Sequence, residues 1–160
     1  MADAMLFSIR AATADDLPKI NALMHGSSAY RGEYHTIIEG TAVSETYLAD
    51  NEVFVADRNG DVLGFYGLLV ANEPADLDLM FVSDNEQGSG IGRALFEHMK
   101  DAARRCGHTT VVIGAHPPAV PFYERMGAVR CGVSPPLPRV TWERPLLKLE
   151  LLEERDALDA

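Results

Sequence analysis

The sequence predicts one domain of mixed α/β (α+β) class, with helices on both faces of a twisted, mostly antiparallel sheet of six to seven strands. Three observations predict it. The chain has 160 residues, of which 47% are hydrophobic, and this suits one domain with a substantial core. Short apolar segments alternate with amphipathic ones in the order β-α-α-β-β-β-α-β-α-β-β. No repeat or linker divides residues 1–160, although the charged tail from Glu153 is expected to fray.

The first half of the chain predicts two helices and four strands. Thr13 is a suitable N-cap, and the helix that follows has an apolar stripe at Leu17, Ile20, Leu23 and Met24. Asn59-Gly60 favours the tight turn that matches the twist of a hairpin. We expect a short second helix at residues 43–49, and strands at 6–10, 53–58, 62–70 and 77–82.

The second half predicts a long amphipathic helix at residues 91–106, which Gly107 ends. At helical spacing, one face of it carries Ile91, Leu95, Met99, Ala102 and Cys106. Two strands of the buried type are expected at 109–114 and 129–133, and an alternating strand at 146–152.

Charge and composition limit the classes of molecule that the chain is expected to bind. The net charge is −10 and no block of Lys or Arg occurs, so the chain is unsuited to nucleic acid and better suited to a cationic amine. No apolar run is long enough to cross a membrane, and the first residues lack the features of a signal peptide, so we expect a cytoplasmic protein. Cys106 and Cys131 lack the spacing of a metal site; no bound metal is expected, and both are predicted to be buried thiols.

Residues 87–92 read Gln-Gly-Ser-Gly-Ile-Gly and join an apolar strand to the long helix. Glycines let a phosphate approach the backbone, and the first N–H groups of a helix lie at the positive end of its dipole. The loop is not a Walker A loop, because no Lys-Ser/Thr pair follows its glycines. It is not a dinucleotide fingerprint either, because that motif lies near the start of a βαβ unit, whereas some eighty residues precede this loop. The alternative is a glycine-rich turn that only caps the helix.

Two segments together resemble the GNAT N-acetyltransferase superfamily. The first is Gln87-x-x-Gly90-x-Gly92, with Val82 five residues before it, which is similar to the family's acyl-CoA pyrophosphate loop. The second, from His116 to Ala128, resembles the family's Asn-x-x-Ala-x-x-Phe-Tyr-Glu-x-x-Gly segment, with His116 in place of the usual Asn. The resemblance covers residues 5–150 and implies the GNAT acyl-CoA N-acyltransferase fold with acetyl-CoA (coenzyme A) as cofactor.

The resemblance also implies which residues meet this cofactor. In the family, backbone N–H groups of a strand splayed at a bulge face the thioester and pantetheine; the matching residues are Met80, Phe81 and Val82. The phosphate end is assigned to the loop and the first helical turn: Gln87, Gly88, Ser89, Gly90, Ile91, Gly92 and Arg93. From the second segment, His116 and Phe122 are assigned to the cofactor as well.

The transfer of an acetyl group to an amine needs an acid for the departing thiolate and a base for the amine. By resemblance, Tyr123 is the acid; the alternative is that it only packs beside Phe122. Asp76 and Asp78 lie at alternate positions of one strand, and Asp76 matches the place of a glutamate base in histone-type members. Solvated carboxylates are the alternative, and Glu73, His25 and His35 are further candidates for the base.

The sequence thus predicts an acetyl-CoA-dependent N-acetyltransferase that acts on a small-molecule amine by direct transfer in a ternary complex. Protein N-terminal or lysine acetylation, and a non-catalytic acyl-CoA-binding module, are the alternatives, and a homodimer is kept open. Residues 25–48 and 134–145 are expected to wall the acceptor side, where Arg31 and Arg139 could hold a carboxylate. The acceptor pocket itself is assigned to Tyr30, Tyr34 and His35.

Overall fold

Seven strands form one sheet at the centre of the structure, in the spatial order β1-β2-β3-β4-β5-β7-β6. Every neighbouring pair is antiparallel except β4 and β5, which run parallel. The computed structural model describes residues 6–27, 42–135 and 142–151 of the chain. The strands are β1 (Ser8–Ala11), β2 (Glu52–Arg58), β3 (Asp61–Leu69), β4 (Ala75–Val82), β5 (Thr110–Gly114), β6 (Val129–Val133) and β7 (Pro145–Glu150).

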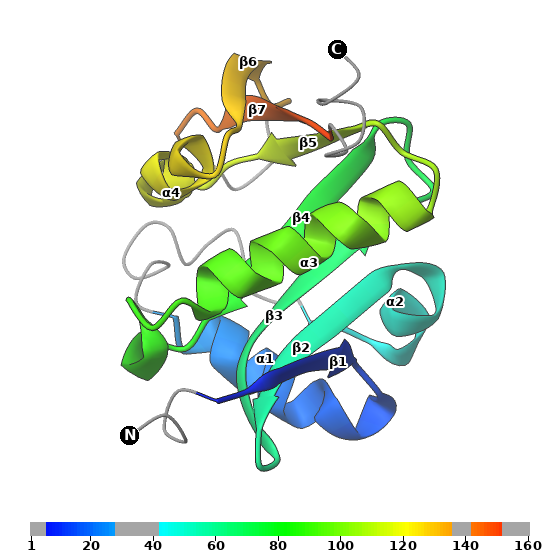
Figure 1. The fold of residues 1–160 in the computed structure, drawn as a ribbon, viewed down its shortest axis with the longest axis vertical. Coiled ribbons are helices and arrows are strands. Elements are labelled where there is room, and N and C mark those ends of the chain that lie inside the picture. The colour runs from blue at the N-terminus through cyan, green and yellow to red at the C-terminus, as the bar shows by residue number, and fades with distance from the viewer. Residues whose placement is uncertain (1–5, 28–41, 136–141, 152–160) are drawn as a thin grey trace.

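Helices cover both faces of this sheet, which confirms the predicted fold class (Figure 1). One face carries α3 (Ile91–Arg105) and α4 (Val120–Arg125), and the other carries α1 (Leu17–His25) and α2 (Glu45–Asp50). Three short 3-10 turns are also described. The turn η2 (Ala14–Asp16) precedes α1, η5 (Asp84–Glu86) precedes the glycine-rich loop, and η6 (Pro117–Ala119) precedes α4. None of the described helices is long and apolar enough to cross a membrane.

Each face of the sheet buries its own apolar cluster. Since successive side chains of a strand point to opposite faces, β3 places Tyr66 in the cluster under α3 and Phe65 in the cluster under α1. The predicted stripe of α1 is confirmed: Ile20 and Met24 are fully buried beside Phe65, and the other two stripe residues pack around them. The fold is therefore held by two apolar layers, with β3 buried between them.

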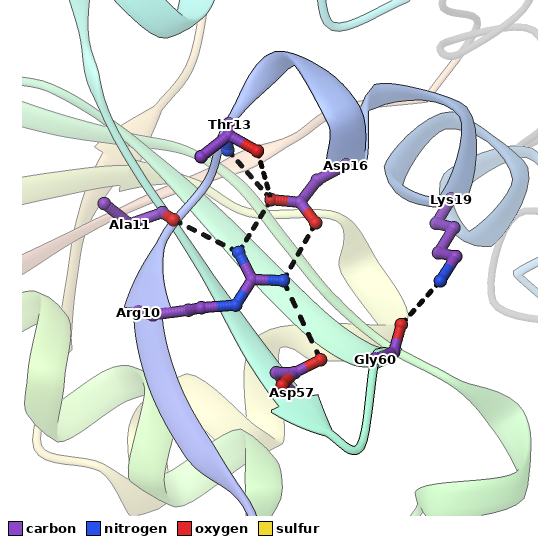
Figure 2. A network of polar contacts seen from close by, with 7 residues as sticks. All are labelled: Arg10, Ala11, Thr13, Asp16, Lys19, Asp57 and Gly60. Carbon is purple, nitrogen blue, oxygen red and sulfur yellow. Dashed lines mark hydrogen bonds and ion pairs between the residues drawn. The ribbon is translucent and has the colours of Figure 1, made fainter.

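A polar network fastens β1 to the first helical turns (Figure 2). The guanidinium of Arg10 donates to both carboxylate oxygens of Asp16, at 2.8 and 2.9 Å, and lies 3.7 Å from Asp57. The backbone N–H of Thr13 donates to the same Asp16 carboxylate at 2.8 Å. Thr13 is the N-cap of η2, which leads into α1, and the N-cap of α1 itself is Asp16. The hydrogen bond from Arg10 lowers the pKa of Asp16 to about 2, against the effect of burial. Asp16 therefore stays ionised and paired at neutral pH.

The predicted hairpin between β2 and β3 is present. Asn59 and Gly60 both have positive φ, at 53° and 92°, as the tight turn requires. The Lys19 ammonium of α1 donates to the carbonyl of Gly60, so the hairpin turn is tied to the helix packed beside it (Figure 2).

Two predictions about burial are wrong. The strand β6 was expected to be buried, but all five of its residues are exposed, and Val129 is 66% exposed. The reason is its place at the edge of the sheet, where β7 is its neighbour. Cys131 lies on this edge strand and Cys106 lies just after the last turn of α3, so both thiols are free and exposed instead of buried.

The strand β4 is irregular at its centre. Gly67 of β3 pairs with Leu79, and Leu68 pairs with Leu77, so Asp78 is left without a partner on β3 and forms a bulge. A bulge places two successive side chains on one face and so shifts the alternation of the strand.

On its other edge, β4 pairs with β5 only at Ala75 and Asp76. Beyond Asp76 the two strands run apart, as Figure 1 shows between the labels β4 and β5. After this point β5 no longer pairs with the backbone of β4, so this edge of β4 borders a gap in the sheet.

Candidate active site

A cavity of about 600 Å³ lies beside the diverging part of β4. Its walls come from β4, from the loop between β4 and α3, and from η6 and α4. Of the residues predicted for cofactor and catalysis, the cavity is lined by Met80, Phe81, Val82, Gln87, Gly88, Gly90, Gly92, Arg93, His116, Phe122 and Tyr123.

The glycine-rich loop forms the end of the cavity where α3 begins. Gly88 and Gly90 have φ of 80° and 90°, a region that favours glycine, and Gly90 is the N-cap of α3. A Cβ at either position would meet no atom of the described structure within 4 Å, so these two glycines face open space. The first N–H groups of α3 lack intrahelical partners, which gives this end of the cavity the character of an anion site.

Hydrogen bonds within the loop fix its shape. The side-chain amide of Gln87 donates to the carbonyl of Val82 at 3.0 Å, and the Ser89 hydroxyl donates to the carbonyl of Glu86. The side chain of Ile91 is only 1% exposed and belongs to the core. Gln87 therefore lines the cavity and also shapes the loop through Val82, whereas Ser89 and Ile91 are not part of the cavity wall.

The opposite wall is the short helix α4 with η6. Phe122 stacks edge-on against Phe96 of α3, with ring centroids 6.0 Å apart, and contacts the start of that helix at Gly92. Tyr123 is 7% exposed and its ring lies 5.5 Å from that of Phe122. His116, the N-cap of η6, is likewise buried at the cavity wall. Tyr123 therefore packs in the core and also reaches the cavity.

The two candidate bases lie where β4 leaves β5. Asp78, the bulge residue, is exposed and accepts a hydrogen bond of 2.8 Å from the hydroxyl of Tyr47 on α2. Burial, and then the charge of Asp78, raise the pKa of Asp76 to about 6, while Arg144 opposes the shift. A carboxylate that titrates near neutral pH is suited to proton transfer at neutral pH.

Several residues around the site were not found by sequence reasoning. Tyr47 packs so closely on Gly67 that any Cβ there would collide with it, and no motif marks this pair. Glu86 and Arg125 also line the cavity, and Arg125 is exposed to solvent there. The acceptor residues Tyr30, Tyr34 and His35, with Arg31 and Arg139, lie outside the described residues.

Comparison with known families decides the class of protein. Residues 24–135, more than half of the chain, match the model of the acetyltransferase (GNAT) domain. The chain belongs to the GNAT acetyltransferase family. The predicted family is thereby confirmed.

The chain is also similar to a curated acetyltransferase. Streptothricin acetyltransferase of Streptomyces lavendulae is 35% identical over 91 residues, which is 53% of this chain and 48% of that protein. The chain thus spans about half the length of this curated relative.

Solved structures share the GNAT fold. A GNAT acetyltransferase of Desulfovibrio desulfuricans aligns with a TM-score of 0.72 at 19% identity, over 92% of this chain and 100% of that one. Nourseothricin acetyltransferase aligns with a TM-score of 0.70 at 20% identity, over 91% and 99% of the two chains. The acetyltransferase YncA of Salmonella typhimurium, solved with its cofactor acetyl-CoA, aligns with a TM-score of 0.68 at 19% identity, over 93% and 96%.

The loop geometry predicts the effect of Gly90→Val. The substitution strains a residue whose φ is 90° and places a branched side chain at the end of the cavity. Loss of two charge-assisted hydrogen bonds, about 1.5 kcal/mol each, would weaken coenzyme A binding roughly a hundredfold. Isothermal calorimetry measures this affinity.

Gly60→Val is the matched control, because Gly60 has φ of 92°, also faces open space and lies at the hairpin turn. It introduces the same backbone strain outside the cavity and should leave the affinity for coenzyme A unchanged. Equal affinities of the folded Gly90→Val variant and the wild type would reduce the loop to a helix cap.

Proposed function

We propose that this chain transfers the acetyl group of acetyl-CoA to a primary amine of a small molecule, directly and within a ternary complex. The observation that carries the proposal is the cavity that joins the glycine-rich loop at the start of α3 to Tyr123 along the splayed part of β4. The streptothricin acetyltransferase relative supports a small-molecule acceptor.

The residues present fit this cofactor. Loop N–H groups and Arg93 suit a pyrophosphate, because both are donors and the loop has no side chain at Gly88 or Gly90 to block its approach. The stretch Met80–Val82, where β4 has left β5, suits the amides of a pantetheine arm, in the manner of an added strand. Bound there, acetyl-CoA supplies an acyl group already activated as a thioester.

Two side chains manage the protons in the proposed reaction. Asp76 accepts a proton from the attacking ammonium through one water, so that the free amine can form the new C–N bond. Tyr123 donates its hydroxyl proton to the sulfur as the C–S bond breaks, and backbone N–H groups of β4 stabilise the developing negative charge on the carbonyl oxygen. The nitrogen loses its second proton to water as the amide forms, and through the solvent this proton restores the Tyr123 hydroxyl. The products are an N-acetylated amine and the free thiol of coenzyme A, and Asp76 then releases its proton to the solvent.

The raised pKa of Asp76 predicts the acid limb of the pH profile. As a base, Asp76 must be ionised, so kcat/KM should rise with pH up to about pH 6 and level off above it. Asp76→Asn should remove this limb and lower kcat by about 10²–10⁴-fold. Since the charge of Asp78 contributes to the raised pKa, Asp78→Asn should move the limb to lower pH. If Asp76→Asn keeps the limb of the wild type, another group is the base.

For Tyr123, the decisive variant is Tyr123→Phe, which keeps the ring against Phe122 and removes only the hydroxyl. Loss of general acid catalysis should lower the single-turnover rate by about 10²–10⁴-fold, with nearly unchanged acetyl-CoA affinity. Rapid-quench measurements with saturating acceptor keep product release from masking the chemical step.

Tyr66→Phe is the control, because it removes a hydroxyl that bonds His98 in the core and is not part of the cavity wall. It should leave the single-turnover rate close to that of the wild type. A loss of less than about threefold in Tyr123→Phe would show that its hydroxyl is not the acid.

A further inference from the structure

A carboxylate lines the cavity beside the glycine-rich loop. Glu86, the last residue of η5, lies next to Gln87 and Gly88 in the wall, and its side chain is 19% exposed. A negative charge at this place would repel the phosphates of coenzyme A, because half-buried charges are only partly screened by water and salt. The end of the cavity that is suited to an anion therefore also contains a negatively charged carboxylate.

Arg58, the last residue of β2, pairs with this carboxylate. Its Nη1 donates to Oε2 and its Nη2 donates to Oε1 of Glu86, each at 3.3 Å, in an end-on, bidentate arrangement. The Nε of Arg58 donates to the carbonyl of Leu6 at 3.2 Å, which fixes the guanidinium plane, and the Arg58 side chain is 25% exposed. A bidentate, half-buried pair with a third hydrogen bond is held more firmly than an isolated surface pair.

The shape of the loop does not require the Glu86 side chain. The backbone N–H of Glu86 donates to the carbonyl of Ser83 at 2.9 Å, and its carbonyl accepts from the N–H of Ser89 at 3.2 Å. The N–H of Ser83 in turn donates to Leu63 of β3 at 2.8 Å. Because backbone hydrogen bonds hold this segment, the loop conformation does not depend on the contact between the Arg58 and Glu86 side chains. The main effect of that contact is to neutralise the charge of Glu86.

We propose that Arg58 sets the affinity for coenzyme A by neutralising Glu86 at the phosphate end of the cavity. This inference rests on the cofactor site of the proposed function. Among the described residues, the hydrogen bonds of the Arg58 side chain reach the cavity wall only at Glu86, so Arg58 is a positioning residue that acts through this carboxylate.

The test is a double-mutant cycle read by calorimetric titration with coenzyme A. Arg58→Met leaves Glu86 unneutralised and should raise Kd about tenfold, with less effect at high salt. Glu86→Gln leaves the positive charge of Arg58 and should bind coenzyme A at least as tightly as the wild type. The double variant carries neither charge and should return to within about threefold of the wild-type Kd.

The matched control is Lys100→Met, which removes one positive charge from a salt bridge of 3.2 Å with Glu97 on α3, away from the cavity. It should not change Kd, whereas Arg58→Lys, which keeps the charge, should restore most of the affinity lost in Arg58→Met. In turnover assays, Arg58→Met should raise KM for acetyl-CoA and leave kcat nearly unchanged.

Two results would overturn the inference while leaving the proposed function in place. One is wild-type affinity in the folded Arg58→Met variant. The other is weakened binding in Glu86→Gln, a result that can be read even if Arg58→Met does not fold. Failure of the wild type itself to bind coenzyme A would instead refute the cofactor site of the proposed function, and the inference with it.

Discussion

The structure depends on one constraint, the parting of β4 from β5 after Asp76. Hydrogen bonds of β4 on the β3 side continue to Val82, so the strand stays ordered while its other edge is released from the sheet. The cavity lies beside this divergence, between the loop at the start of α3 and the residues of η6 and α4. A β4 that paired with β5 along its whole length would leave no room for a ligand between the two strands, whatever the loop after it. The bulge at Asp78 lies within this parting.

Charge divides the site into two ends within a chain whose net charge is −10. At the start of α3, backbone N–H groups and Arg93 favour an anion, and Arg58 compensates the charge of Glu86. Where β4 leaves β5, the carboxylates of Asp76 and Asp78 favour a cation. Burial raises the pKa of Asp76 to about 6, which is close to neutral pH. An anionic cofactor and a cationic amine would thus be attracted to opposite ends of the split strand. This division of charge, more than any single residue, supports acetyl transfer to an amine.

The parts of the fold that depend on local sequence could be predicted. Gly88 and Gly90 have the positive φ expected of a phosphate-binding turn, and Asn59-Gly60 forms the expected hairpin, because turns are encoded by neighbouring residues. The family resemblance implies a bulge in this strand, but its position at Asp78 could not be predicted, since the apolar alternation of β4 continues through it. The pair of Arg58 and Glu86 joins residues 28 positions apart, and only the arrangement of β2 beside η5 brings them together. The exposure of β6 depends on its place in the sheet, which its own five residues do not encode.

Acetyl transfer itself provides the most direct test. The wild-type chain is incubated with acetyl-CoA and single primary amines, and free thiol is measured together with the mass of each amine. We expect at least one small amine to gain one acetyl group for each thiol released, in reactions that require both substrates at once. Acetyl-CoA that binds and stabilises the protein, but yields neither thiol nor acetylated product with any amine, would contradict the proposed activity. The GNAT fold would then serve this chain as a binding module.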